Sequence, residues 1–152
     1  MNNDSAEIEC LVKDFLACLC LLNQCMLEDQ SHFSVNDFVA LEQSDLSKSQ
    51  LNANLRILID QLAAHAAITG LAGDLFEKLS SYADTLAAHQ QSVLLELIHS
   101  LRKEYQTGLQ LMHLNRQVVH ANLTYVKELF SHLTQSPPCS KSTVYDQSAA
   151  II

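Results

Sequence analysis

Residues 82–133 decide the fold of the chain and read YADTLAAHQQSVLLELIHSLRKEYQTGLQLMHLNRQVVHANLTYVKELFSHL. The segment has no proline and one glycine, Gly108, and its apolar residues recur every seven positions until Pro137 and Pro138. This spacing predicts one very long α-helix, about 75 Å in length at about 1.5 Å per residue. A compact domain of this size could not surround such a helix, so we expect part of its apolar stripe to face a partner.

Two neighbouring rows of this helix differ in character. One row is apolar throughout and consists of Ile98, Tyr105, Met112, Val119, Val126 and Leu133. The other begins apolar and turns small and polar halfway, through Leu94, Leu101, Gly108, Asn115, Asn122 and Leu129. An Asn in an apolar seam costs stability but fixes register and the choice of partner. The alternative is a helix that closes its own bundle, with both Asn exposed at the edge of the stripe.

The composition predicts an all-α protein. The chain has 152 residues, of which 48% are hydrophobic, which is enough for one domain with a core. With 3 Gly and 2 Pro it lacks most of the turn residues that a sheet needs. We expect an elongated antiparallel bundle of about three long helices and a short one at residues 1–133, followed by a flexible tail at 134–152.

The remaining helices are predicted from apolar periodicity and cap residues. The first should span residues 6 to about 29, with a stripe of Ile8, Leu11, Val12, Phe15, Leu19, Leu22 and Met26. A turn at residues 31–34 should precede a second helix, capped by Ser34 or Asn36 and reaching about residue 68, with a stripe of Phe38, Leu41, Leu51, Leu55, Leu58, Leu62 and Ala66. A short helix at 75–79 follows, and Ser81 with Asp84 resembles a capping box that opens the long helix.

Charge is unevenly distributed. The net charge is −8, and residues 1–45 hold nine acidic residues against Lys13 alone. Asp45 and Lys48 are spaced to form a local ion pair. An acidic first third without a basic stripe argues against nucleic acid or an anionic membrane surface as partner. Solubility is the simpler account of the acidity.

The cysteines predict a reducing compartment. Cys10, Cys18, Cys20 and Cys25 share one predicted helix, where neighbours point apart, so we expect free thiols and a cytoplasmic protein. The apolar run at residues 15–22 is too short for a membrane span and lacks the features of a signal peptide.

No pattern in the sequence predicts catalysis. Glu96 and His99 form one Glu-x-x-His, whereas a di-iron bundle needs two such motifs and two more carboxylates, so we expect two solvated residues. His113 and His120 share a face but have no third ligand. Phosphate-binding and nucleophile motifs are absent from the sequence. We therefore predict a protein that is not an enzyme and uses no cofactor.

Four segments carry a resemblance to a known family: DLSKSQL at 45–51, LNRQ at 114–117, NLTYVKEL at 122–129 and TVYD at 143–146. Together with the order of parts, which covers nearly the whole chain, they resemble the FlgN family of flagellar type III export chaperones. The Asn-Gly of the family's long helix and the glycines of its tail are missing here, where the tail reads YDQS at 145–148.

The resemblance implies a cytoplasmic chaperone whose long helix binds terminal helical segments of hook–filament junction proteins. The residues expected to bind cargo are Met112, Asn115, Val119, Asn122, Val126, Leu129 and Leu133. The tail would dock on a component of the export gate through Val144, Tyr145 and Asp146. These apolar tail residues, with Ile151 and Ile152, are typical of a docking peptide, although a terminus without function would also fit.

Two other classes of protein remain as alternatives. A structural or regulatory coiled coil would pair with a second copy of itself, as a homodimer, along the same apolar stripe. A metal-binding bundle enzyme is the weaker alternative, because only one Glu-x-x-His is present.

Overall fold

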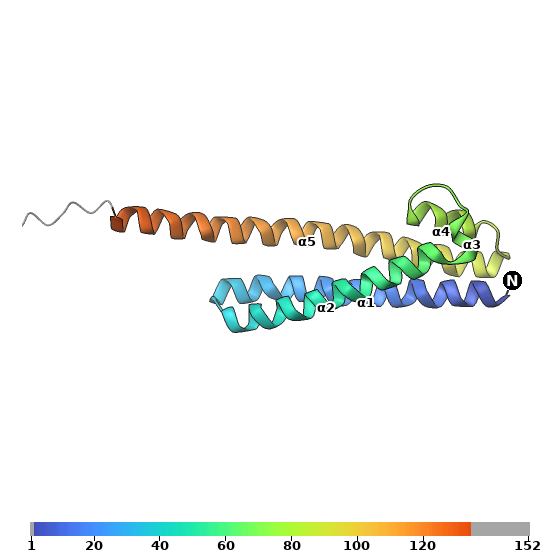
Figure 1. Cartoon of the computed structure of the whole chain (residues 1–152), viewed down its shortest axis with the longest axis horizontal. Coiled ribbons are helices and arrows are strands. Elements are labelled where there is room, and N and C mark those ends of the chain that lie inside the picture. Colours follow the sequence, from blue (N-terminus) through green and yellow to red (C-terminus); the bar gives the residue numbers. More distant parts are fainter. Residues whose placement is uncertain (1, 135–152) are drawn as a thin grey trace, which may run out of the picture. The chain divides into compact units, whose positions relative to one another are not determined.

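The computed structural model describes residues 2–134, and every regular element in that range is a helix (Figure 1). The helices are α1 (Asn2–Val35), α2 (Phe38–Ala64), α3 (Ala66–Thr69), α4 (Leu75–Ala83) and α5 (Ala88–Thr134). The all-α prediction with a very long C-terminal helix is confirmed. The chain divides into two compact units, residues 1–116 and 117–152, so α5 contributes to both. The domain boundary predicted at residue 133 lies within the second unit.

Helices α1 and α2 form a tight hairpin. The predicted turn at residues 31–34 is wrong, because α1 continues to Val35 and ends in a Schellman motif. Asn36 adopts a left-handed conformation with φ of 55°, and the backbone N–H of Asp37 donates to the carbonyl of His32 at 3.0 Å. The side chain of Asp37 then accepts from the N–H of Ala40 at 3.0 Å and so caps α2 in place of the predicted residues.

The second helix stops earlier than predicted. At His65 the backbone becomes extended, with φ of −62° and ψ of 130°, and the imidazole Nδ1 accepts from the N–H of Ala67 at 3.3 Å. His65 therefore ends α2 and caps α3. Within the predicted stripe of α2, Leu55 and Leu62 are buried, but Phe38 and Ala66 at its two ends are exposed.

The start of the long helix also differs from the prediction. The capping box is formed by Asp74 and Glu77, whose side chains and backbone N–H groups bond reciprocally at 2.9 Å, and it opens α4. Ser81 lies inside α4 and Asp84 ends it. Helix α5 begins only at Ala88, after a turn in which the Thr85 hydroxyl donates to the Tyr82 carbonyl at 2.7 Å.

The core of the first unit joins all five helices near the N-terminal end of α5. The predicted stripe of α1 is confirmed, since its members are buried or half-buried. Helix α5 adds three buried side chains to this core, Leu94, Ile98 and Leu101. The largest completely buried apolar side chains are Ile8, Val12, Leu62, Ile68, Leu79, Leu94 and Leu101.

Helix α1 is both long and apolar. By length and composition alone, Asp4–Val35 could cross a membrane. The core helix of a soluble protein and a signal sequence meet the same criterion. In this chain Val12, Phe15 and Leu19 pack in the core, and 39% of the apolar window of α1 is buried.

Gly108 allows α5 to approach α1 closely. A Cβ atom at this position would lie 2.7 Å from Oδ1 of Asn23, whose buried amide donates to the backbone carbonyl and the carboxylate of Glu104 at 2.8 and 2.9 Å. Gly to Ala inside a helix normally stabilises by about 1 kcal/mol. We expect Gly108→Ala instead to destabilise by about 1–2 kcal/mol, measured by urea unfolding.

The double variant Asn23→Ala, Gly108→Ala supplies the control. Asn23→Ala removes the side chain that a Cβ at residue 108 would clash with. In the Asn23→Ala background, Gly108→Ala should therefore stabilise the chain, as Gly to Ala normally does inside a helix. Equal effects of Gly108→Ala in both backgrounds would contradict a steric conflict with Asn23.

Candidate protein-binding surface on α5

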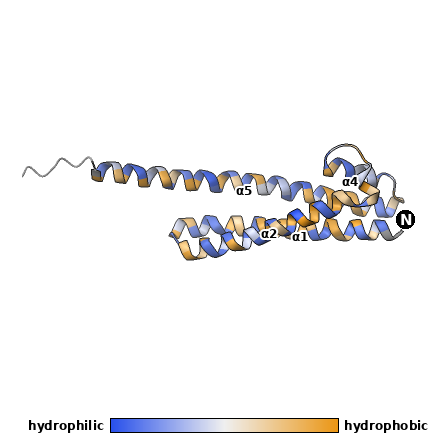
Figure 2. Ribbon diagram, viewed as in Figure 1, coloured by the Kyte–Doolittle hydropathy of each residue, from blue (hydrophilic) through white to orange (hydrophobic). Residues whose placement is uncertain are grey.

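The burial of α5 decreases along its length while its apolar content continues. Leu94, Ile98 and Leu101 are buried, but every described side chain from residue 116 to 133 is exposed. Figure 2 shows hydrophobic colours recurring along the whole helix. The end of burial therefore reflects where α5 loses its neighbours within the first unit and is not a change in its sequence pattern.

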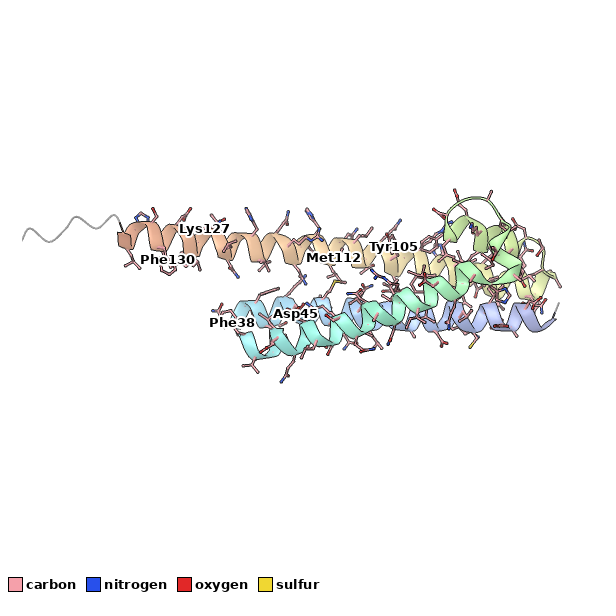
Figure 3. All side chains as sticks on the ribbon, viewed as in Figure 1. Phe38, Asp45, Tyr105, Met112, Lys127 and Phe130 are labelled. Carbon is pink, nitrogen blue, oxygen red and sulfur yellow. The ribbon has the colours of Figure 1, made fainter. Side chains whose placement is uncertain are left out.

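In the first unit, the predicted apolar row becomes exposed after its first member. Ile98 is buried, whereas Tyr105 and Met112, labelled in Figure 3, are exposed. Tyr105 still contacts Phe76 of α4, with 5.9 Å between ring centroids, and the guanidinium of Arg102 lies 5.4 Å from the same ring. Met112 is thus the first predicted cargo-binding residue that offers exposed apolar surface.

The two Asn of the polar row have different surroundings. Asn115 is half-buried; its amide Nδ2 donates to the carbonyl of Met26 at 2.8 Å, and its Oδ1 accepts from Nε2 of Gln30 at 3.3 Å. Asn122, in the second unit, is exposed. Asn115 therefore sets the register of α5 against α1 of the same chain, a role that the sequence prediction gave to a partner helix.

In the second unit, the exposed apolar residues of α5 fall on one side of the helix. At about 100° per residue, they occupy less than half of its circumference. We call this set the α5 stripe; it consists of Val118, Val119, Leu123, Tyr125, Val126, Leu129, Phe130 and Leu133. The sequence prediction named Val119, Val126, Leu129 and Leu133, and Asn122 lies within the same arc. The prediction missed four residues, because it used two rows of seven and left out the rows beside them: Val118, Leu123, Tyr125 and Phe130.

The other candidate groups do not assemble into a reactive site. Among residues 2–134, no group of three or more His, Cys, Asp or Glu is placed to hold a metal ion, and Glu96 and His99 are exposed. Cys10, Cys18, Cys20 and Cys25 are free thiols, as predicted. Burial raises the pKa of the Cys18 thiol, which makes it a poor nucleophile at neutral pH.

Val144, Tyr145 and Asp146, the predicted gate-docking residues, lie outside the described residues. Comparisons with known proteins found no matching family model, curated protein or solved structure. The resemblance to the FlgN family therefore rests on the four sequence segments quoted above.

The contrast between the two Asn gives a testable difference. Asn115→Leu should destabilise the chain by about 1 kcal/mol, because it removes two hydrogen bonds to α1. Asn122→Leu should leave the free energy of unfolding within about 0.5 kcal/mol of the parent value but promote self-association, since it replaces the one amide within an exposed apolar arc by an apolar side chain. Urea unfolding and light scattering test the two effects, and equal destabilisation by both changes would contradict the assignment.

Proposed function

We propose that the chain is a cytoplasmic export chaperone of the FlgN type. Its α5 stripe would bind a terminal helix of a hook–filament junction protein and keep that protein unassembled until it reaches the type III export gate. The protein would act by binding alone, without catalysis or a cofactor.

The observation that carries the proposal is the α5 stripe itself. It brings eight large apolar side chains to the surface within 16 residues of one helix. Exposed apolar surface of this extent is unfavourable in water and is typical of a surface that a partner covers. A straight amphipathic face suits recognition of another helix, which is the form of cargo that the sequence resemblance implies.

A self-pairing coiled coil is the second candidate, and the charge pattern favours it less. Specific coiled-coil pairs carry charged residues beside a narrow apolar seam, which set orientation and partner choice. Residues 117–133 contain only two charged side chains, Lys127 and Glu128. The apolar arc is also wider than a seam made of every third and fourth residue.

A binding titration tests the two candidates together. Terminal helical segments of the hook–filament junction proteins from the same organism would be titrated into the full chain by calorimetry, with scrambled peptides as controls. One-to-one binding of a junction-protein segment would support the chaperone. Failure of every such segment to bind, together with a solution mass of two chains, would support the coiled coil.

The tail should be dispensable for binding cargo but needed for export. Deleting residues 137–152, or changing Tyr145 to Ala, should leave the melting temperature and cargo affinity unchanged and reduce cargo secretion. A short docking peptide depends heavily on its one aromatic residue. Normal secretion by the truncated chain, measured in culture supernatant, would show that gate docking does not use the tail.

A further inference from the structure

The turn between α1 and α2 exposes a second apolar surface, separate in residues from the α5 stripe. Val35, Phe38 and Val39 are 70%, 73% and 66% exposed, and Leu46, two turns farther along α2, is also exposed. We call these four residues the hairpin patch. The turn itself does not require them, because the Schellman motif and the Asp37 cap already satisfy the backbone.

Acidic side chains are interspersed with the hairpin patch. Asp37 lies between Val35 and Phe38, and Glu42 lies between Val39 and Leu46 on the exposed side of α2. Figure 3 shows Phe38 and Asp45 on the first turns of α2. Residues 14–47 contain six acidic residues and no Lys or Arg.

The cation that follows this segment in the sequence is already engaged. The ammonium of Lys48 lies 2.5 Å from Oδ2 of Asp29 and 2.7 Å from Oδ1 of Asp45. Glu42 and Asp37 therefore have no basic residue of their own segment to balance them. A partner segment would bind the hairpin patch most tightly if it carried both positive charges and apolar side chains.

We propose that the hairpin patch docks a cationic amphipathic segment of a partner protein, in which apolar anchors alternate with Lys or Arg. Anionic membranes and nucleic acids are repelled by the same carboxylates. Docking at the hairpin patch does not depend on cargo binding. The α5 stripe is nearly free of charge, so charges on a partner would add little to its affinity for that stripe.

A designed peptide pair tests this docking mode on the full chain. The probe is a fluorescent 18-residue helical peptide of Leu and Lys, compared with its Leu and Glu counterpart by anisotropy at about 50 and 300 mM NaCl. We expect the Lys peptide to bind, more weakly at the higher salt, and the Glu peptide not to bind. Phe38→Ser with Val39→Ser should weaken binding by at least about tenfold.

Matched variants distinguish binding at the hairpin patch from non-specific attraction of the Lys peptide to an acidic chain. Ile57→Ser removes another exposed apolar residue of α2, 56% exposed, and should not change the affinity. Glu42→Lys should weaken binding several-fold and reduce its salt dependence, whereas Asp60→Lys, also exposed on α2, should change it much less. Unchanged melting temperatures are expected, because all these side chains are exposed.

Four outcomes of these measurements would overturn the proposal, and a fifth comes from a change in the α5 stripe. The first is binding of the Glu peptide. The second and third are equal losses of affinity for the Lys peptide, either from Ile57→Ser and the Phe38/Val39 variant or from Glu42→Lys and Asp60→Lys. The fourth is a solution mass that falls from two chains to one when Phe38 and Val39 are changed. The last result would assign the hairpin patch to a second copy of the chain. Val126→Asp should leave Lys-peptide binding intact, and a loss there would place the peptide on the α5 stripe instead.

Discussion

Changing Val126 to Asp should weaken cargo binding by at least about 100-fold while α5 stays helical. Val126 is exposed in the middle of the α5 stripe, so the free chain can accommodate a carboxylate there. In the complex the same carboxylate would lose its water without gaining a partner, which costs several kcal/mol. Calorimetry with the junction-protein segments would measure the loss, and circular dichroism would measure helix content.

Thr124→Asp is the matched control, because it places the same charge on the polar side of the same helix. It should leave the affinity within about threefold of the parent value. Val119→Asp should behave like Val126→Asp. If either Val variant unfolds the whole chain, the stripe is part of the internal core; if both bind normally, cargo does not use it.

Replacing Lys48 with Met should cost about 3 kcal/mol of stability. The carboxylate of Asp29 is only 1% exposed, its Oδ2 accepts from Lys48 at 2.5 Å, and its Oδ1 has no hydrogen-bond partner. Removing the ammonium leaves a buried charge uncompensated. The double variant Asp29→Leu, Lys48→Met should recover most of the loss in urea unfolding, and failure to recover it would show that the two residues act independently.

The pH dependence follows from the pKa of Lys48. Burial lowers that pKa, but the hydrogen bonds and charges of Asp29 and Asp45 raise it more, so it lies above the ordinary value of 10.5. The ammonium therefore makes its full contribution to the free energy of unfolding below pH 10.5, and this contribution is lost as the pH rises through the raised pKa. Asp45→Asn should cost less than about 1 kcal/mol, because that carboxylate is exposed.

Sequence periodicity predicted the fold because one apolar face per helix is enough to define a bundle. It located the stripe of α1, the long α5 and the pairing of Asp45 with Lys48. It misplaced the helix ends because several residues in each linker can cap, and tertiary packing selects among them. Asn36 with Asp37, and His65, provided the local hydrogen bonds that fixed those ends.

The polar contacts could not be predicted, because their partners are distant in sequence. Asp29 meets Lys48 only after the hairpin reverses, and Asn115 meets Met26 across 89 residues. The apolar arc of the candidate site was predictable from residues 118–133 alone. The sequence could not show which part of the apolar row of α5 is buried, because that depends on where α1 packs against α5 in the folded chain.

The long separation between α1 and its partner residues on α5 has a consequence during synthesis. Asn23 of α1 bonds to Glu104, 81 residues later, and Leu101 closes the core. At a translation rate of about 5–20 residues per second, the α1–α2 hairpin, complete at Ala64, would wait on the order of 2–8 s until Glu104 of α5 is made. During that time the side of the core that Leu94, Ile98 and Leu101 of α5 will complete is still open, so the nascent hairpin exposes apolar surface that other proteins could bind before its own last helix arrives.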